Sequence, residues 1–522
     1  MRTTSTGSHR VRSLLKSDVV YLGLLLAGLF VALLVVSQTA AFSGDEGYNL
    51  NAARLVNAGK RPYLDFFYQQ APLYLYLNAA WMRVFGETWR SSHVLSVLFT
   101  AGCLALIIEY LLRRFRDSGR GPATAAMAGF FLVFSIPVVE AGCVSQPYAA
   151  CLFWSAAAFR LAVARRPLPG LAAFGSGLCA GAAVASSLLA APLLPVLLCW
   201  TAQIARSGER RKRSFQYLAG AGIAFLPLLT LAFHGPRQAL FDVVEFHLFY
   251  RVTGWGWQTI AKNNFACVLG LVDSPQGILL ILGAAAWFAT RGRETWGERT
   301  GAEIRLSAWL AACFGVYLFL VAPTYETYFV LMTPFVAMLS AAGAASLGMK
   351  LPSRRIRALS LVMLLALYFP PAARWYHRQM AAERWDYWEG IAAKVAQVTP
   401  PDEDLYSAWD VIYFLRKRPP PLGFENVHSF GRLPVPVELA SRLHVVAQSQ
   451  VGDWWRSARF TTVITPTEDS ETERLGLRQV SGLVHWGGPA QPWPGIERLG
   501  FSRRMLDWDV AMFRREKDHP EQ

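Results

Sequence analysis

The chain has 522 residues, of which 53% are hydrophobic and only 17% are charged. A soluble protein of this length has about a quarter charged residues, so the composition excludes an ordinary cytosolic globular protein. Runs of about 17–21 nearly uncharged residues recur through positions 1–371, and each is long enough to cross a hydrocarbon core of about 30 Å. The sequence therefore predicts an α-helical polytopic membrane protein.

The first apolar stretch runs from Val19 to Ser37 and follows a basic amino-terminal segment, as the core of a secretory signal would. Signal cores have about 7–15 apolar residues, and this stretch is longer. We interpret it as an uncleaved membrane anchor rather than as a cleaved signal.

The net charge of +15 is compatible with nucleic-acid binding, but its distribution indicates membrane topology instead. Lys and Arg cluster in short segments between the apolar runs, whereas the turns at 140–147 and 323–326 contain none. By the positive-inside rule the basic segments are cytoplasmic. They lie around residues 2–16, 113–120, 160–166, 206–213, 291–305 and 350–357.

The apolar runs predict about eleven spans. They lie near residues 19–37, 93–112, 122–139, 147–164, 170–186, 187–204, 215–233, 277–290, 306–322, 327–346 and 357–371. Residues 170–204 could form one tilted helix, but their basic flanks favour a hairpin that turns at Ser186 and Ser187. An odd count places the amino terminus in the cytoplasm and residues 372–522 outside, in a multi-pass protein of the plasma membrane.

Two predicted outer loops, at 38–92 and 234–276, are too long to be simple connections within the transmembrane domain 1–371. The first contains residues 73–85, whose apolar and polar residues alternate as in a helix lying along the membrane interface. The second contains the aromatic run Trp255-Gly256-Trp257, which we interpret as a headgroup anchor in preference to a sugar-binding surface.

From Arg374 onward no apolar run of span length remains. Residues 375–398 have the pattern of a helix, and strand-like runs follow at 405–408, 460–464 and 510–513. We therefore expect a small α/β domain outside the membrane, formed by residues 372–522.

The sequence predicts no metal centre and no cofactor. All seven cysteines lie in or beside predicted spans, without the paired spacing of a metal site or a disulfide framework. Neither HExxH nor a phosphate-binding GxxxxGK[ST] loop occurs. An enzyme on the outer face lacks cytosolic nucleotide sugars, so its activated substrate has to arrive on a lipid.

Asp45 and Glu46 form an acidic pair directly after the first span. A carboxylate at the membrane boundary costs free energy unless a pocket or water holds it, so such residues are usually functional. The pair lies in a segment rich in Tyr, Asn, Gln and Pro, which suggests an enzyme that acts on a lipid-borne substrate.

Residues 59–66, Gly-Lys-Arg-Pro-Tyr-Leu-Asp-Phe, and the following Ala-Pro-Leu-Tyr run resemble the first outer loop of the polyprenyl-phosphate-dependent GT-C glycosyltransferases. This family includes the protein O-mannosyltransferases, the aminoarabinose transferase of lipid A and the rhizobial lipopolysaccharide-core transferases. Residues 325–335 resemble the family's aromatic entry into a span, and residues 410–420 its C-terminal outer domain. The resemblance covers most of the chain and is most specific in the first loop.

The sequence departs from the family pattern at two places. Many relatives have His-Pro-Pro-Leu where this chain has Gln70-Ala71-Pro72-Leu73. Many also have an Asp at the start of the fourth span, where this chain reads Ser-Gln-Pro and Glu140 is the nearest acid. We therefore do not infer the substrate of this protein from that of any named relative.

The resemblance implies inverting transfer of a sugar from a polyprenyl-phosphate donor to a hydroxyl of an envelope acceptor, which can be a lipid, a glycan or a protein. We expect Asp45 to be the catalytic base, because a carboxylate can take the proton of the attacking hydroxyl. Cations on the outer face would stabilise the departing phosphate. The candidate substrate-binding residues are Glu46, Arg54, Tyr63, Asp65, Gln69, Gln70, Glu140, His247, Arg251, Tyr325 and Tyr328.

Two other classes of protein fit a polytopic chain. A transporter or flippase without transferase activity predicts charges or broken helices in mid-span and repeated halves. A non-catalytic scaffold leaves the polar first loop unexplained. We expect membrane lipid as a partner and no nucleic acid. The sugar, the acceptor, the prenyl chain length, the metal dependence, the oligomeric state and the number of spans in residues 170–204 stay open.

Overall fold

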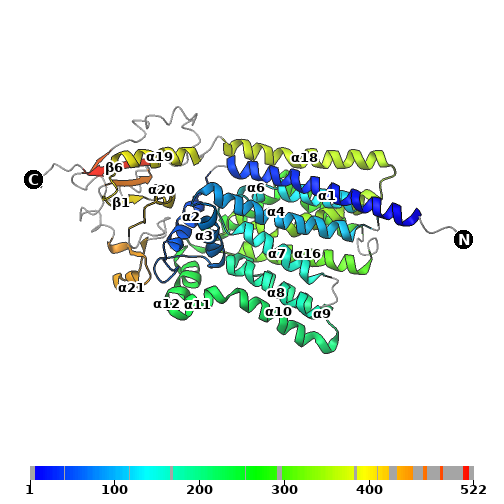
Figure 1. The fold of residues 1–522 in the computed structure, drawn as a ribbon, viewed down its shortest axis with the longest axis horizontal. Coiled ribbons are helices and arrows are strands. Elements are labelled where there is room, and N and C mark those ends of the chain that lie inside the picture. Colours follow the sequence, from blue (N-terminus) through cyan, green and yellow to red (C-terminus); the bar gives the residue numbers. More distant parts are fainter. Residues whose placement is uncertain are drawn as a thin grey trace, which may run out of the picture. The chain divides into compact units, whose positions relative to one another are not determined.

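The computed structural model describes residues 6–39, 42–116, 118–164, 169–252, 254–290, 297–380, 385–407, 409–421, 432–450, 462–466, 483–485 and 510–515. The described residues are mostly helical and pack as two compact units (Figure 1). The unit that we call the helical unit takes in residues 1–38, 93–226 and 255–376. The second, the mixed unit, takes in residues 39–92, 227–254 and 377–522.

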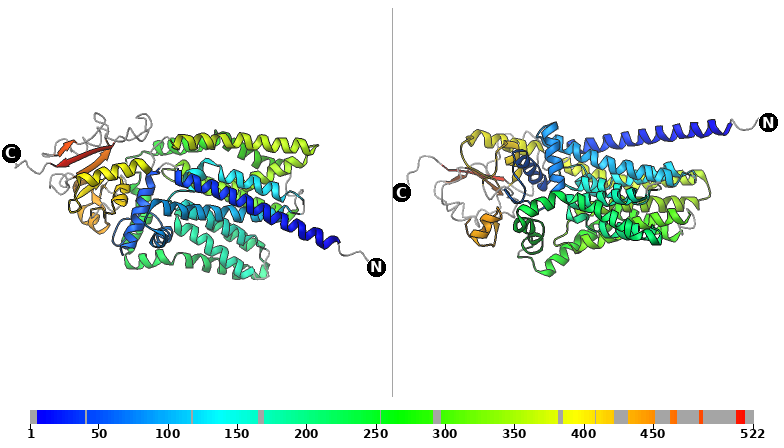
Figure 2. Two further views of the ribbon diagram at one scale, coloured as in Figure 1. Left: turned by 45° about the horizontal axis from the view of Figure 1, so that its top comes forward. Right: turned by 60° about the horizontal axis from the view of Figure 1, so that its bottom comes forward.

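Long apolar helices make up the helical unit (Figures 1 and 2). They and its short helices are α1 (Thr6–Thr39), α4 (Trp89–Arg114), α5 (Gly121–Val133), α6 (Ile136–Ala141), α7 (Tyr148–Ala162), α8 (Pro169–Ser186), η1 (Leu188–Ala190), α9 (Leu193–Ile204), η2 (Ser207–Glu209), α10 (Arg210–Ala224), α13 (Trp257–Val272), α14 (Pro275–Ala289), α16 (Glu298–Leu320), η4 (Glu326–Met332), α17 (Thr333–Met349) and α18 (Arg354–Met380).

The helices of this unit pack closely where small residues face each other. Helix α8 lies along both α7 and α10, and α17 lies against α5, α14 and α16. A Cβ atom on Gly177 would lie 1.9 Å from the carbonyl oxygen of Tyr217, so α8 and α10 can approach this closely only because residue 177 is glycine. Seams of small residues are typical of helix packing inside membranes.

Six helices in the described ranges are long and apolar enough to cross a membrane. Two more candidates are bent pairs: α10 with α11 (Leu226–His234), bent by 57°, and α13 with α14, bent by 75°. Shorter apolar helices are Gly121–Val133, Tyr148–Ala162 and Leu188–Ile204. These helices indicate a multi-pass membrane protein.

Two segments of the helical unit, residues 257–272 and 170–204, bear on the predictions from the sequence. Within the predicted outer loop 234–276, residues 257–272 form the apolar helix α13, which the sequence did not predict. The polar residues Lys262, Asn263 and Asn264 interrupt its apolar pattern. At 170–204 the helix α8 ends at Ser186, and Ser187 is extended before α9 begins, as the basic flanks predicted.

The mixed unit combines short helices with two small sheets. Its elements are α2 (Gly44–Asn57), α3 (Leu73–Phe85), α11, α12 (Pro236–Leu240), the π-helix η3 (Phe241–Tyr250), α19 (Trp385–Val398), β1 (Leu405–Ser407), α20 (Asp410–Arg416), β2 (Arg432–Leu433), α21 (Val437–Arg442), β3 (Val446–Ala447), η5 (Gln448–Gln450), β4 (Thr462–Pro466), β5 (Leu483–His485) and β6 (Val510–Arg515). The helix predicted over 73–85 is confirmed as α3.

The larger sheet has the strand order β1-β4-β6-β5, in which β1 and β4 are parallel and the other pairs are antiparallel. The smaller sheet pairs β2 with β3 in parallel. The three strand-like runs of the sequence correspond to β1, β4 and β6, although Ala408, Phe460 and Thr461 lie outside the described residues. The single helix predicted over 375–398 corresponds to the end of α18 and to α19, with residues 381–384 outside the described ranges.

Candidate active site

The acidic pair opens helix α2, where the sequence predicted a loop. The preceding Ser43 is extended, and its backbone N–H donates to the Glu46 carboxylate at 3.0 Å. Glu46 is fully buried, whereas Asp45 in the same first turn is exposed. The two carboxylates therefore differ in their surroundings: Glu46 closes the end of the helix, and the Asp45 side chain is exposed.

Helix α2 is held in place by α20. A Cβ atom on Gly47 would lie 2.5 Å from the backbone nitrogen of Val411, so the two helices touch at this glycine. The Arg54 guanidinium donates to the carbonyl oxygens of Tyr413 at 2.9 Å and Arg418 at 3.2 Å. Partial burial lowers the pKa of Arg54. Arg54 thus fastens α2 to the end of α20, which gives it a structural task that the sequence did not indicate.

The segment that follows α2 folds back onto this helix through tyrosines. Tyr63 is buried at φ +68°, and its hydroxyl donates to the Gln70 carbonyl oxygen at 2.6 Å. Tyr48 on α2 stacks on Tyr68 with ring centroids 5.3 Å apart. The Tyr48 hydroxyl also accepts the backbone N–H of Gln69 at 2.9 Å. These contacts fix the course of residues 63–70, a segment we call the return segment.

The π-helix η3 holds the return segment at two points. Asp242 accepts the backbone N–H of Tyr68 at 2.9 Å, and the Nε2 atom of His247 lies 2.6 Å from the Gln69 carbonyl oxygen, to which its N–H donates. Burial raises the pKa of Asp242 well above its ordinary value. Burial and the charge of Arg251 lower the pKa of His247 to about 4. Burial thus acts against the charged form of both side chains.

The sequence did not point to Asp242, Tyr48 or Tyr68 as residues of this region. A carboxylate inside the otherwise apolar run Phe241–Tyr250 was the available signal for Asp242. Nothing in the local pattern indicated its partner Tyr68, which lies 174 positions away in the chain.

Asp65, Gln69 and Gln70 differ in their surroundings. Asp65 forms a two-pronged ion pair with Arg61, at 2.9 Å and 3.0 Å, and the guanidinium lowers the pKa of Asp65. This exposed pair stabilises the turn after α2. The side-chain oxygens of Gln69 and Gln70 are buried and have no hydrogen-bond partner among the described residues. They are acceptors that a ligand could use.

Glu140, Tyr325 and Tyr328 belong to the helical unit. Glu140 lies in α6, which packs against η4, and burial together with the charge of Glu326 raises the pKa of Glu140 to about 7. Tyr325 and Tyr328 pack edge to face at 5.3 Å. Asn264 on α13 accepts the Thr324 N–H at 3.0 Å and so holds the turn that leads into η4. The helical unit thus contains a second cluster of polar residues, which includes the carboxylates of Glu140 and Glu326.

The candidate residues therefore form two groups. In the mixed unit α2, the return segment and η3 bring together most of them, with Asp45, Gln69 and His247 on the three elements. Glu140, Tyr325 and Tyr328 lie in the helical unit. Across the described ranges, no group of three or more His, Cys, Asp or Glu side chains is arranged to hold a metal ion.

The fold of the chain is that of the GT-C glycosyltransferases. No family model matches the sequence, and no curated protein matches it. The likeness is to solved structures at low identity, and it is therefore a likeness of fold.

Among these structures is ArnT from Cupriavidus metallidurans bound to undecaprenyl phosphate, which is 14% identical with a TM-score of 0.65 and covers 96% of this chain and 99% of its own. The same protein in the apo state is 13% identical with a TM-score of 0.59, over 89% and 96% of the two chains. The oligosaccharyltransferase of Archaeoglobus fulgidus in complex with Zn and sulfate is 13% identical with a TM-score of 0.52, over 87% and 70%.

Proposed function

We propose that the protein is an inverting glycosyltransferase, which moves a sugar from a polyprenyl-phosphate donor to a hydroxyl of an envelope acceptor on the outer face of the membrane. The observation that carries the proposal is the exposed Asp45 at the start of α2, beside a buried partner acid, in a chain with the GT-C fold. The structure of ArnT with undecaprenyl phosphate supports the choice of a polyprenyl-phosphate donor.

Asp45 acts as the base in this reaction. The acceptor oxygen attacks the anomeric carbon from the side opposite the phosphate, the carbon–oxygen bond to the phosphate breaks, and the acceptor proton passes to the Asp45 carboxylate. Such proton transfer contributes about 10²–10⁴ in rate. Asp45 lies in the first turn of α2, where its side chain is exposed.

Other residues of the mixed unit position this base and the donor. Glu46 holds the end of α2, and the contacts of Tyr68 and Gln69 with η3 hold the return segment beside it. We propose that Arg251 binds the donor phosphate. The charge of Arg251 acts on His247, and His247 contacts the return segment. The buried amide oxygens of Gln69 and Gln70 accept hydroxyl groups of the sugar or acceptor.

The test is sugar transfer by the purified protein in liposomes that contain a radiolabelled polyprenyl-phosphate sugar and an envelope extract as acceptor. Asp45→Asn keeps the shape of the side chain but cannot take a proton, so we expect loss of transfer with donor binding retained. Glu46→Gln is the matched control, because an amide oxygen can still accept the Ser43 N–H. A well-folded Asp45→Asn protein that transfers at the wild-type rate would refute the assignment, and Glu140 would be tested next. Mass spectrometry of envelope glycolipids and glycoproteins from a deletion strain would identify the acceptor.

We also propose the topology. Residues 1–371 form the transmembrane domain with a cytoplasmic amino terminus, and residues 372–522 form an extracytoplasmic α/β domain. Among the described residues, six single helices and two bent pairs are candidate spans, and counting the three shorter apolar helices as spans as well gives the eleven that the sequence predicts. Reporter fusions after residues 116, 210 and 300 should be cytoplasmic, and fusions after 60, 250 and 450 external. A cytoplasmic signal after 450 would contradict the odd span count.

A transporter or flippase is the alternative that one observation favours. The bent pairs α10–α11 and α13–α14 are similar to the discontinuous helices of transporters. A flippase would move labelled donor across liposomes that lack acceptor, and the Asp45→Asn change would leave this movement intact.

A further inference from the structure

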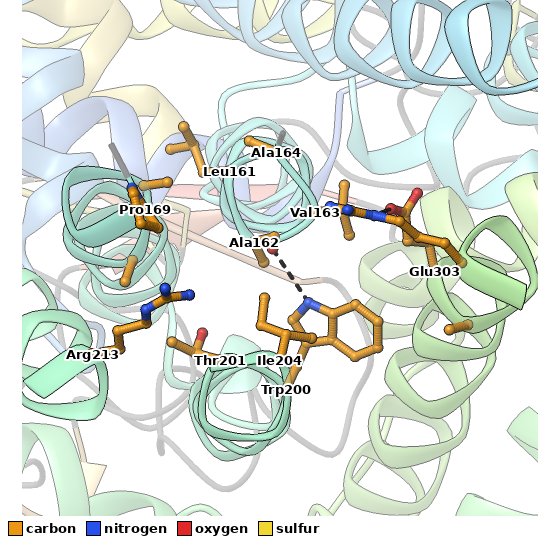
Figure 3. Close-up of a pocket in the computed structure, with 14 residues that line it drawn as sticks. Leu161, Ala162, Val163, Ala164, Pro169, Trp200, Thr201, Ile204, Arg213 and Glu303 are labelled. Atoms are coloured by element: carbon orange, nitrogen blue, oxygen red, sulfur yellow. Dashed lines mark hydrogen bonds and ion pairs between the residues drawn. The ribbon is translucent and has the colours of Figure 1, made fainter. Parts of the chain in front are cut away.

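The helical unit contains a cavity of about 580 Å³ that none of the candidate site residues lines. It lies where α7 and α9 end and where α8, α10 and α16 begin, so it is at one end of this set of helices. Most of its lining is apolar and includes Leu161, Trp200 and Ile204 (Figure 3). Pockets of about 300–1,000 Å³ hold small organic ligands.

The charged side chains of the cavity carry an excess of positive charge. Its lining contains Arg213, Arg299 and Glu303. Figure 3 shows Arg213 and Glu303 on opposite sides of the cavity. Glu303 is buried and already pairs with Arg114 at 2.6 Å, and Arg299 approaches it at 3.3 Å. One carboxylate thus lies between two guanidinium groups, which leaves positive charge for an anion.

Arg213 faces the cavity from α10 and pairs with Glu209, which does not line the cavity. The side chain of Arg213 is only 17% exposed, although it sits in a run of four basic residues, 210–213. Its neighbour Arg211 is exposed and does not line the cavity. Arg213 is therefore distinguished from the surrounding basic residues by its position against the cavity.

Trp200 forms one wall. Its indole N–H donates to the Ala162 carbonyl oxygen at 3.3 Å, which ties α9 to the end of α7 (Figure 3). Tryptophan together with arginine at the ends of apolar helices is typical of the depth at which lipid headgroups lie. The cavity therefore combines apolar walls with cationic groups at that depth.

We propose that this cavity binds the phosphate headgroup of an acidic phospholipid. The guanidinium groups of Arg213 and Arg299 bind the phosphate oxygens, and the apolar walls contact the glycerol and the first methylenes of the acyl chains. The mostly apolar lining favours a lipid over inorganic phosphate. A lipid bound here stabilises the contacts among α7, α8, α9, α10 and α16, at a site separate from the candidate active site.

The test is native mass spectrometry of the full-length protein, released from membranes into detergent and supplied with phosphatidylglycerol or phosphatidylcholine. We expect the wild type to retain phosphatidylglycerol in preference. Arg213→Gln and Arg299→Gln should each weaken retention about fivefold, because one basic side chain near a membrane surface is worth about that factor. Arg211→Gln, in the same turn as Arg213, is the matched control and should retain lipid like the wild type.

A second variant fills the cavity without changing charge. Ala172→Trp places an indole in the lining and should reduce phosphatidylglycerol retention. Thermal unfolding in detergent shows whether each variant is folded. Equal retention of the two lipids, or retention that Arg213→Gln, Arg299→Gln and Ala172→Trp leave unchanged, would overturn the proposal. Stabilisation by millimolar inorganic phosphate that is equal to that by phosphatidylglycerol would also overturn it, in favour of a soluble anion.

Discussion

Replacing Gly47 by alanine tests how α2 places Asp45. The added Cβ would lie 2.5 Å from the Val411 nitrogen and 3.0 Å from the Val411 Cβ, so α2 and α20 have to separate by roughly 1 Å to restore contacts of about 3.5 Å. Overpacking of this kind costs about 1–3 kcal/mol. Alanine returns about 1 kcal/mol of helix propensity, so the expected net loss of unfolding free energy is about 0–2 kcal/mol.

The expected effect on catalysis is larger than the effect on stability. A displacement of about 1 Å at a catalytic group can lower the rate about 100-fold. The assays are thermal unfolding of the purified protein and the liposome transfer assay. Gly222→Ala in α10 is the matched control, because nothing lies within 4 Å of its added Cβ, and it should be neutral or stabilising. A Gly47→Ala protein with the wild-type melting temperature and transfer rate would refute this account of how α2 is held.

Three further predictions concern the contacts that hold α2 and the return segment. Asp242→Asn should raise the free energy of unfolding at pH 7, because the raised pKa of Asp242 means that the folded protein loses stability as pH rises, and an amide does not ionise. Asp242→Leu should lower the free energy of unfolding by about 1–3 kcal/mol, because the Tyr68 N–H loses its acceptor. Equal losses of stability for the two variants in urea unfolding would contradict this reasoning. Since the pKa of His247 falls from 6.5 to about 4, the unfolded chain binds more protons between these values, and stability should fall as pH falls from 6.5 to 4. His247→Gln should flatten this slope in unfolding curves, and an unchanged slope would argue against it. Glu46→Ala should cost about 0.5–2 kcal/mol in thermal unfolding while Glu46→Gln costs less, and the reverse order would exclude the capping role.

The apolar helices could be located from the sequence because their pattern is local. The run Val19–Ser37 corresponds to the candidate span Val20–Thr39, and the break at Ser186 follows from basic residues on both flanks. Helix α13 was missed for a physical reason. The side chain of Asn264 donates to the carbonyl oxygens of Phe319 and Val321, so contacts distant in sequence satisfy a polar residue that locally resembles a loop.

The acidic pair was found from its place after the first span, but the different surroundings of its members were not. Ser43-x-x-Glu46 has the spacing of a capping box, so the sequence did contain a signal for α2 and for the burial of Glu46. The contact of Asp242 with Tyr68 had no such signal, because it joins distant segments. Local chemistry could thus be read from the chain, whereas contacts between elements could not.

The hydrogen bonds of Arg54 can form only late in the synthesis of this protein, because they join segments that are far apart in the chain. Its acceptor, the carbonyl oxygen of Tyr413, follows 359 positions later. At about 5–20 residues per second, a ribosome needs on the order of 20–70 s to make that stretch. During this interval α2 exists without the helix that Gly47 and Arg54 contact. A chain that stops after α18 would therefore carry Asp45 on a helix without this support.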